Sequence, residues 1–358
     1  MNAALICVYL CLFTAAAQDP AAYFKRALEF HQAGKIEDAV RQYRICLQLR
    51  PDWVEARSNL GAALSRLGHY DEAAAEYQTA LKLAPDNFQA RLNLALAYYK
   101  AARMQAAVAE LSRLRTANPN HEQVALLLAD AWFRLGENRK VIEVLSPLSS
   151  NEQNLAVAYL LGTALIREGE AGRGQVFIDR IMRRGETSEA HLLLGLAQLR
   201  NRQYPEAIRH FNRALELNPE VEGGLSLLGQ ALLGQDERER ARKAFSQAIA
   251  ASPNDFDAHF HLGVMLREDR EIEAALKHLE RAHQLRPSAV RVSYQIGLAL
   301  LAAGRNEEAR EVLEKIVAAA PDFVEAHTSL ATAYYRLKRK ADGDRHRETE
   351  RRLRQSRQ

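Results

Sequence analysis

Seven of the ten prolines in this 358-residue chain recur at a fixed interval. Within each of two groups the spacing is 34 residues, and the gap between the groups fits three more units, two of them one residue shorter. A period of this size is typical of solenoid proteins, in which each unit packs only against its neighbours. The recurring prolines are Pro51, Pro85 and Pro119, and then Pro219, Pro253, Pro287 and Pro321.

A second position of the repeat is always small. If the proline stands at position 32, the first of ten units begins at Pro20, and position 8 is Gly or Ala in every unit. We therefore expect two helices of one hairpin to touch at this position. The ten residues are Ala27, Gly61, Ala95, Ala129, Gly162, Gly195, Gly229, Gly263, Gly297 and Ala331.

The second half of each unit has the pattern of an amphipathic helix. In the second unit, small or aromatic residues stand at positions 20, 24 and 27, which are Ala73, Tyr77 and Ala80. Spacings of four and three place these side chains on one helical stripe. Leu60-Gly61, Ala73, Tyr77, Ala80 and Pro85 together resemble the tetratricopeptide repeat family, and the likeness recurs in phase from about Pro20 to Tyr335.

The resemblance implies an all-α fold, a right-handed superhelical solenoid of antiparallel helix hairpins. We expect nine hairpins and a tenth whose second helix is a charged cap. The Trp that the family usually has at position 4 is absent. Arg57 and three histidines stand there instead, and for His191, His259 and His327 we favour packing or a contact within the hairpin over metal ligation.

The predicted organisation has five segments. Residues 1–17 are a signal peptide, 20–154 are repeat units 1–4, 155–187 are an irregular unit 5, 188–335 are units 6–9 with the first helix of unit 10, and 336–358 are a basic cap helix or tail. Pro147 falls inside a predicted helix, and Gly172 and Gly174 weaken helix propensity in unit 5. Two interpretations stay open: ordinary drift between units, or a flexible joint between two stiff segments.

The N-terminus has the pattern of a secretory signal. An apolar run without charge is followed by Ala15-Ala16-Ala17, which favours cleavage after Ala17 and export to the periplasm or the medium. No Lys or Arg precedes the run, so an uncleaved membrane anchor is the alternative. Processing would leave Cys46 as the one cysteine, and we expect it to be a buried apolar residue.

Motifs of enzymes and nucleic-acid binders are absent from the sequence. It contains no H-E-x-x-H, no phosphate-binding loop and no G-x-S-x-G elbow. The 49 basic and 45 acidic residues are too balanced for a general nucleic-acid binder. The units are similar to the arrays of protein O-glycosyltransferases, yet only about twenty residues follow the last repeat, so we expect no catalytic domain, cofactor or metal.

The resemblance also implies a binding surface. In the family, first-helix positions 2, 5, 6, 9, 12 and 13 line the concave side, and we call residues at these positions the groove-face residues. Basic groups at position 13 and amides at position 6 would suit an extended peptide with acidic side chains. These residues are Arg66, Lys100, Arg134, Arg167 and Arg200, with Asn59 and Asn93.

Apolar groove-face residues are concentrated in the middle of the array. They include Tyr159, Leu192, Leu193, Leu196 and Leu199. If exposed, they would form an apolar patch that binds a partner. If the irregular units pack differently, they are buried instead, and both interpretations stay open here.

The sequence thus favours an exported, non-enzymatic scaffold that binds a peptide or helix of another protein. The alternative is a structural oligomer of the cell envelope that self-associates through the leucines. Segment 336–358 has ten Lys or Arg and four Asp or Glu. Its charge fits a polar cap, with contact to an anionic surface as a weaker hypothesis.

Overall fold

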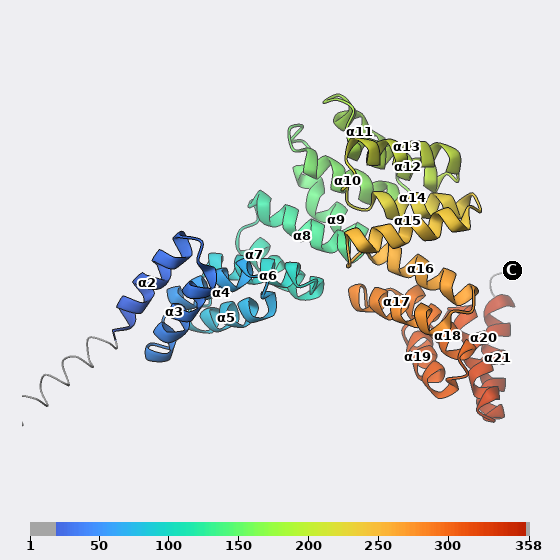
Figure 1. Ribbon diagram of the computed structural model, residues 1–358. Coiled ribbons are helices and arrows are strands. Elements are labelled where there is room, and N and C mark those ends of the chain that lie inside the picture. Colours follow the sequence, from blue (N-terminus) through green and yellow to red (C-terminus); the bar gives the residue numbers. More distant parts are fainter. Residues whose placement is uncertain (1–18, 356–358) are drawn as a thin grey trace, which may run out of the picture. The chain divides into compact units, whose positions relative to one another are not determined.

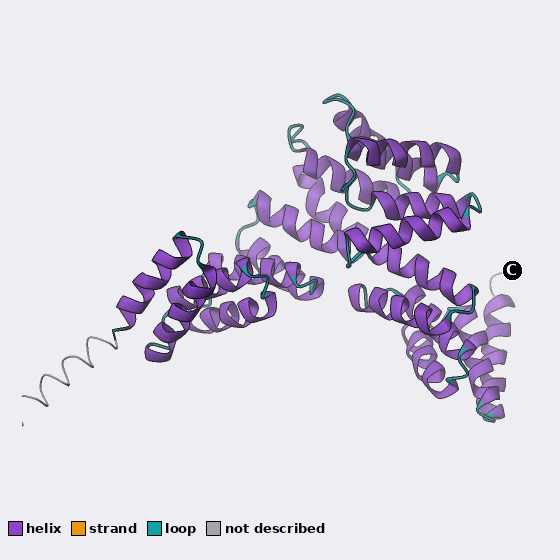
Figure 2. Ribbon diagram, viewed as in Figure 1, coloured by secondary structure: helices purple, strands orange, loops and turns teal. Residues whose placement is uncertain are grey.

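A computed structural model describes residues 19–355, which form helices and connecting turns without a β-strand (Figure 2). The chain divides into two compact units, residues 1–148 and 149–358, which we call the N-terminal and C-terminal units. The predicted signal at residues 1–17 lies outside the described residues. Between residues 19 and 355, no helix combines the length and apolar character needed to cross a membrane.

The N-terminal unit consists of four helix hairpins, in which each helix packs against the next (Figure 1). The first and second helices of the hairpins alternate along the chain. They are α2 (Pro20–Gln32), α3 (Ile36–Leu49), α4 (Val54–Arg66), α5 (Tyr70–Leu83), α6 (Phe88–Lys100), α7 (Met104–Ala117), α8 (Glu122–Arg134) and α9 (Asn138–Leu145), followed by the 3-10 turn η1 (Ser146–Leu148).

The C-terminal unit consists of six hairpins of the same kind. Its helices are α10 (Leu155–Arg167), α11 (Ala171–Met182), α12 (Ser188–Arg200), α13 (Tyr204–Leu217), α14 (Gly224–Gly234), α15 (Arg238–Ala251), α16 (Phe256–Glu268), α17 (Ile272–Leu285), α18 (Val290–Ala302), α19 (Asn306–Ala319), α20 (Val324–Arg336) and α21 (Lys340–Gln355). The predicted all-α array of antiparallel hairpins is confirmed, and the second helix of the tenth hairpin is α21.

The hairpins close over the small residue at position 8. A Cβ atom added to Gly61 would lie 2.8 Å from the ring of Tyr77, and one added to Gly195 would lie 2.5 Å from the ring of Phe211. Both rings are almost fully buried. The small residue at position 8 therefore makes room for the large side chain at position 24, which is an aromatic ring in some units and a leucine in others, such as Leu279 and Leu313.

All ten hairpin turns use the same backbone conformation. The residue at position 15 has a positive φ in every unit, between 58° and 88°. Five of these residues are glycines, such as Gly34, which adopt this conformation without steric cost. The other five, such as Arg202, adopt it although they carry a side chain, so the packing of the two helices determines the turn.

The irregular middle of the sequence is visible in two places. Helix α9 has 8 residues and ends at Leu145, and Pro147 lies in η1, since a proline cannot donate the helical hydrogen bond. Helix α11 forms despite its glycines. A Cβ on Gly174 would lie 2.6 Å from Ile166, so this glycine permits close packing within the hairpin.

Cys46 is buried in the core of the first hairpins, as the sequence predicts. Burial raises the pKa of its thiol, although Arg50 acts in the opposite direction. The thiol is therefore held in its neutral form as an apolar core residue.

Candidate functional site

The groove-face cations of α4 and α6 are exposed. Arg66 and Lys100 end these helices and make no ion pair with any residue from 19 to 355. The pKa of His31 is lowered by burial and, second, by the Arg66 cation, so Arg66 makes the surface near α2 positive. These two cations are available to an acidic ligand.

Amide and hydroxyl groups accompany these cations on the same helices. Asn59 on α4 is half-buried and makes no hydrogen bond within the described chain. Asn93 on α6 accepts a hydrogen bond from Gln89 Nε2 at 3.0 Å, which leaves its own amide protons for another acceptor. The Ser58 hydroxyl is buried without a hydrogen-bond partner in the part of the chain that the structure describes. The sequence analysis missed Ser58, although it stands at groove-face position 5.

The Arg134 guanidinium already has partners within the described chain, unlike the cations of Arg66 and Lys100. Its Nε donates to Asp130 at 3.1 Å and to the Tyr99 hydroxyl, and its guanidinium carbon lies 5.0 Å from the centre of the Tyr99 ring. Burial and then the Asp130 charge raise the pKa of Tyr99, so the phenol stays neutral. Asp130 therefore balances the charge of Arg134, which makes it a weaker ligand cation than Arg66 or Lys100, and its role in binding stays a prediction.

The predicted row of five cations divides between the two units, three in the N-terminal and two in the C-terminal unit. Arg200, at the end of α12, is exposed. Arg167 is half-buried on α10 and acts on Asp257 of α16. Desolvation raises the pKa of Asp257, but Arg286, Arg167 and His261 outweigh it and lower the pKa below its ordinary value. Arg167 therefore stabilises a carboxylate of its own unit.

Of the two interpretations left open for the apolar groove-face residues, burial fits Leu192, Leu193 and Leu196. Leu192, Leu193 and Leu196 are 1%, 0% and 5% exposed, while Leu199 and Tyr159 are half-buried. Helix α12 packs against α10 as well as α11. Leu193 Cδ1 lies 3.7 Å from the place of a Cβ on Gly162, so the leucine fills the space over this glycine. Leu192, Leu193 and Leu196 therefore belong to the core and provide no surface for a partner or for self-association, whereas Leu199 keeps part of its side chain exposed.

Position 4 makes a contact within the hairpin, as expected. In units 6, 8 and 10 its histidine meets a second histidine at position 23, on the following helix. In units 2 and 3 the same positions hold Arg57 with Glu76 and Arg91 with Glu110. The partner residues were missed, although the constant separation of 19 residues is visible in the sequence.

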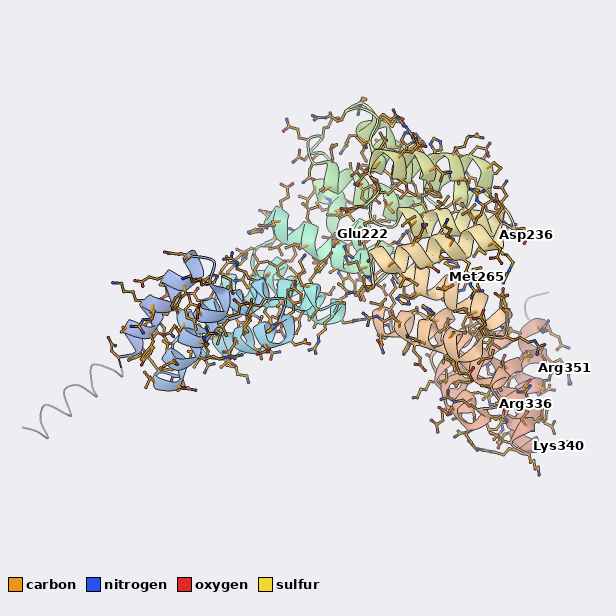
Figure 3. The ribbon with its side chains drawn as sticks, in the orientation of Figure 1. Glu222, Asp236, Met265, Arg336, Lys340 and Arg351 are labelled. Carbon is orange, nitrogen blue, oxygen red and sulfur yellow. The ribbon has the colours of Figure 1, made fainter. Side chains whose placement is uncertain are left out.

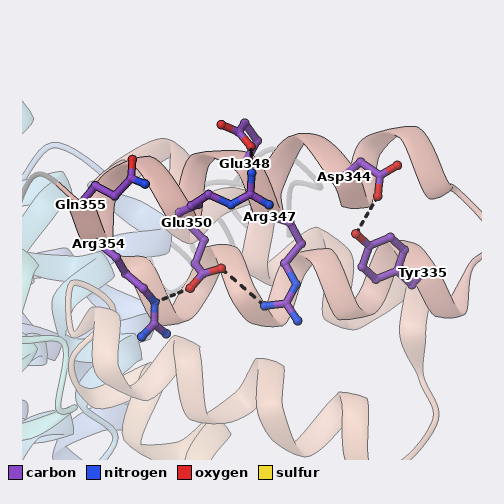
Figure 4. A pocket seen from close by; sticks show the side chains of 8 residues that line it. Tyr335, Asp344, Arg347, Glu348, Glu350, Arg354 and Gln355 are labelled. Atoms are coloured by element: carbon purple, nitrogen blue, oxygen red, sulfur yellow. Dashed lines mark hydrogen bonds and ion pairs between the residues drawn. The ribbon is translucent and has the colours of Figure 1, made fainter.

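The last hairpin has a surface hollow between Tyr335 and α21 (Figure 4). Glu350 lies between Arg347 and Arg354 and forms an ion pair with each, and Tyr335 donates to Asp344 at 2.9 Å. Arg336, Lys340 and Arg351 lie at this C-terminal end (Figure 3). The charges of α21 are largely compensated within the helix, which fits the role of a polar cap.

Metal chemistry has no visible support in the described chain. Among residues 19–355, no three histidine, cysteine or acidic side chains come together in a way that could hold a metal ion.

The candidate binding site is a polar face on α4 and α6. It consists of Arg66, Lys100, Asn59 and Asn93.

These features define a helical-hairpin repeat protein with a polar face on its first helices. Three family models described as tetratricopeptide repeat match the chain, one at residues 66–131 and 266–342, one at 24–87 and 226–290, and one at 188–221. The chain belongs to the tetratricopeptide repeat family, with about ten units, and this fold supports a protein–protein interaction scaffold.

Solved structures give distant likenesses. MamA (residues 41–end) from Desulfovibrio magneticus RS-1 is 23% identical, with a TM-score of 0.45, over 48% of this chain and 97% of that chain. Yeast Tom70 is 15% identical, with a TM-score of 0.38, over 93% of this chain and 92% of that chain. No curated protein sequence matches the chain.

Proposed function

We propose that the protein is a non-enzymatic scaffold that binds an extended, acidic segment of a partner protein along α4 and α6. One observation carries this proposal: Arg66 and Lys100 are exposed without an ion pair among residues 19–355, beside the unpartnered amide of Asn59. Some basic side chains of the N-terminal unit, such as Arg57 and Arg91, have carboxylate partners. Arg66 and Lys100 differ from the other cations without an ion pair in the described part of this unit in standing at groove-face position 13.

The groups suit a peptide in an extended conformation. The amides of Asn59 and Asn93 can bond to a peptide backbone, while Arg66 and Lys100 bind its carboxylates. Exposed ion pairs contribute about 0.2–1 kcal/mol each, and a hydrogen bond contributes about 0.5–1.5 kcal/mol. Affinity therefore rests on several weak contacts, and the two cations select against basic segments.

Export completes the proposal. Its support is the uncharged apolar run that ends in Ala15-Ala16-Ala17. The intact mass of the chain recovered from its native host tests it: a mature chain that begins at Gln18 supports export by cleavage, and a chain that keeps its apolar start contradicts it.

Charge reversal at the two cations should weaken binding of an acidic peptide. We expect Arg66→Glu with Lys100→Glu to lower the affinity for a labelled peptide of about 12 residues with several glutamates by at least about tenfold, because two attractions become repulsions. Fluorescence anisotropy at low salt measures the effect, and a glutamine version of the peptide should bind wild type more weakly.

The matched control is Lys35→Glu with Lys82→Glu. These lysines are also exposed in the N-terminal unit, but outside the groove-face positions, and the change in net charge is the same. The control should bind nearly as wild type does. Equal losses in both variants would show a general charge effect and would contradict the proposed face.

A further inference from the structure

Six of the eleven histidines form three pairs with the same geometry in the C-terminal unit. In each pair the two Nδ1 atoms approach closely: 2.9 Å for His191–His210, 3.0 Å for His259–His278 and 2.9 Å for His327–His346. The ring centres lie 5.1–5.2 Å apart. Each pair links the first helix of a hairpin to its second helix, in units 6, 8 and 10.

The surrounding acceptors determine where the protons lie. His259 Nε2 lies 3.2 Å from the Pro253 carbonyl, and His327 Nε2 lies 3.0 Å from the Pro321 carbonyl. A carbonyl only accepts, so each Nε2 carries a proton, and Nδ1 of the same neutral ring must be the acceptor. His278 and His346 therefore donate from Nδ1. Glu186 replaces the carbonyl for His191, at 2.9 Å, which gives the same assignment.

This assignment allows one added proton per pair. A proton on the outer Nε2 of the second-helix histidine leaves the Nδ1–H···Nδ1 bond in place. A second proton must go to Nδ1 of the first-helix histidine, which is the acceptor of that bond. Double protonation thus breaks the bond and places two imidazolium rings in contact, where like charges repel.

The N-terminal unit fills the same two positions differently. Arg57 donates to the Pro51 carbonyl at 2.9 Å and to Glu76 at 2.8 Å, and Arg91 donates to the Pro85 carbonyl at 2.6 Å and to Glu110 at 2.7 Å. An arginine–glutamate pair keeps its charges between about pH 5 and 8. The same link between helices is therefore insensitive to mild acid in one unit and titratable in the other.

We propose that the three histidine pairs are acid-sensitive clasps, which hold hairpins 6, 8 and 10 closed at neutral pH and release them in mild acid. The C-terminal unit then carries this response to pH, while hairpins 2 and 3 of the N-terminal unit, which have arginine–glutamate links, stay closed. His31 of hairpin 1, whose pKa burial also lowers, is a separate titrating group. The clasps lie outside α4 and α6, so the inference does not depend on the proposed peptide site.

The charged groups around the first two pairs act in different directions. Glu186 faces His191, and Arg213 and then His191 lower the pKa of Glu186 to about 2, so it stays ionised beside His191. On the other side of the pair, Arg209 adds to the lowering of the pKa of His210. Around the unit 8 pair the neighbours are Arg281, which acts on His259, and Lys277, which acts on His278. Both are cations and oppose protonation.

The unit 10 pair has neighbours of both signs. Burial, His327 and Arg345 lower the pKa of His346, while Asp342 and Glu314 act in the opposite direction. Tyr334 stacks on His346 with ring centres 5.6 Å apart. Among the described residues, the charged neighbours of the unit 8 pair include no carboxylate that could offset a second positive charge. We therefore expect hairpin 8 to open first as the pH falls.

The way stability depends on pH follows from the difference in histidine pKa between the closed and the opened hairpin. Burial is the main cause that lowers the pKa of His210, His259, His278 and His346 in the folded chain. The opened hairpin has ordinary histidines with a pKa of about 6.5, so it binds more protons in mild acid. The histidine pairs therefore make their full contribution to the stability of the hairpin above about pH 6.5. This contribution falls as the pH drops towards the lowered histidine pKa values of the folded chain.

Hydrogen exchange of the full chain tests the clasps. Amide protection is compared at about pH 7.5 and about pH 5.5, after correction for the intrinsic exchange rate. We expect protection of α16 and α17 to fall by up to about tenfold per pH unit for each proton taken up, with smaller losses in α12–α13 and α20–α21. Protection of α4–α7 should change little.

The decisive variant copies the pair that the chain uses elsewhere. Burial also lowers the pKa of His261 on α16, so the comparison is made in a His261→Gln background. In this background His259→Arg with His278→Glu reproduces Arg57 and Glu76 in unit 8 and should abolish the acid loss in α16–α17 alone. The matched control, His69→Gln, removes an exposed histidine and should leave the loss unchanged. An acid loss in α16–α17 that persists in a folded variant overturns the proposal, as does an equal loss in α4–α7 of wild type.

If the variant with His259→Arg and His278→Glu does not fold, a second measurement on the wild-type chain tests the clasps. Histidine ring resonances of the wild-type chain report each titration directly. The clasps predict that the paired histidines take up their protons in two steps per pair and that the second step lies below the ordinary histidine pKa of about 6.5. Six independent titrations near the ordinary pKa of about 6.5 would overturn the proposal.

Discussion

Leu193→Asp should destabilise the hairpins of α10–α13 by about 3–5 kcal/mol, because it places a carboxylate without a partner in the core. Leu193 has no exposed surface and fills the space over Gly162. Urea denaturation followed by circular dichroism measures the loss, and hydrogen exchange assigns it to these helices. Binding of the acidic peptide to α4 and α6 should be retained.

Leu199→Asp is the matched control for this substitution. Leu199 lies on the same helix α12 and is half-exposed, so its carboxylate can reach water. Its cost should be less than half that of Leu193→Asp. Equal and small costs for both variants would mean that the leucine face is open to solvent, which would contradict the packing of α12 on α10.

Phe211→Ala should cost about 3–5 kcal/mol, since it leaves a cavity beside Gly195. The Phe211 ring is fully buried and occupies the space that a side chain at position 195 would take. The measurement is the same urea denaturation. A loss below about 1 kcal/mol would show that the ring does not fill the hairpin.

Phe211→Leu provides the comparison. Leucine stands at the same position over Gly263 and Gly297, as Leu279 and Leu313. Phe211→Leu should therefore cost less than about 1.5 kcal/mol, because the hairpin already accommodates this side chain elsewhere in the array. A cost equal to that of Phe211→Ala would contradict this equivalence of units.

The fold could be predicted because its determinants are local and repeated. The small residue at position 8, such as Gly61, and the ring at position 24, such as Tyr77, lie in one hairpin and recur in phase. Ten copies of a short-range pattern make the hairpin unambiguous. Pro147 also acts locally, and the structure ends α9 before it, as the missing backbone donor requires.

The candidate site could be predicted only in part, because exposure depends on how neighbouring hairpins meet. Arg66 and Lys100 are exposed, as position 13 suggests. Leu193 stands at a groove-face position but is buried, since α12 approaches α10 directly. Arg134 is neutralised by Asp130, four residues away, and contacts Tyr99, thirty-five residues away. Family positions alone do not reveal these contacts.

The histidine pairs show which information a search for enzyme motifs misses. The separation of 19 residues joins position 4 to position 23 across a hairpin turn, and it recurs at His191, His259 and His327. The same separation joins Arg57 to Glu76. The apolar positions preserve the hairpin, while this polar link differs between the two units and gives them different responses to acid.

The most direct test of the central claim is an unbiased selection of peptides by the full-length protein. A random library of about 12 residues is selected in parallel against wild type and against the Arg66→Glu, Lys100→Glu variant. We predict that wild type enriches peptides rich in Asp and Glu and that the variant loses them. Enrichment of the same peptides by both proteins, or of basic or purely apolar peptides by wild type, would contradict an acidic partner bound along α4 and α6.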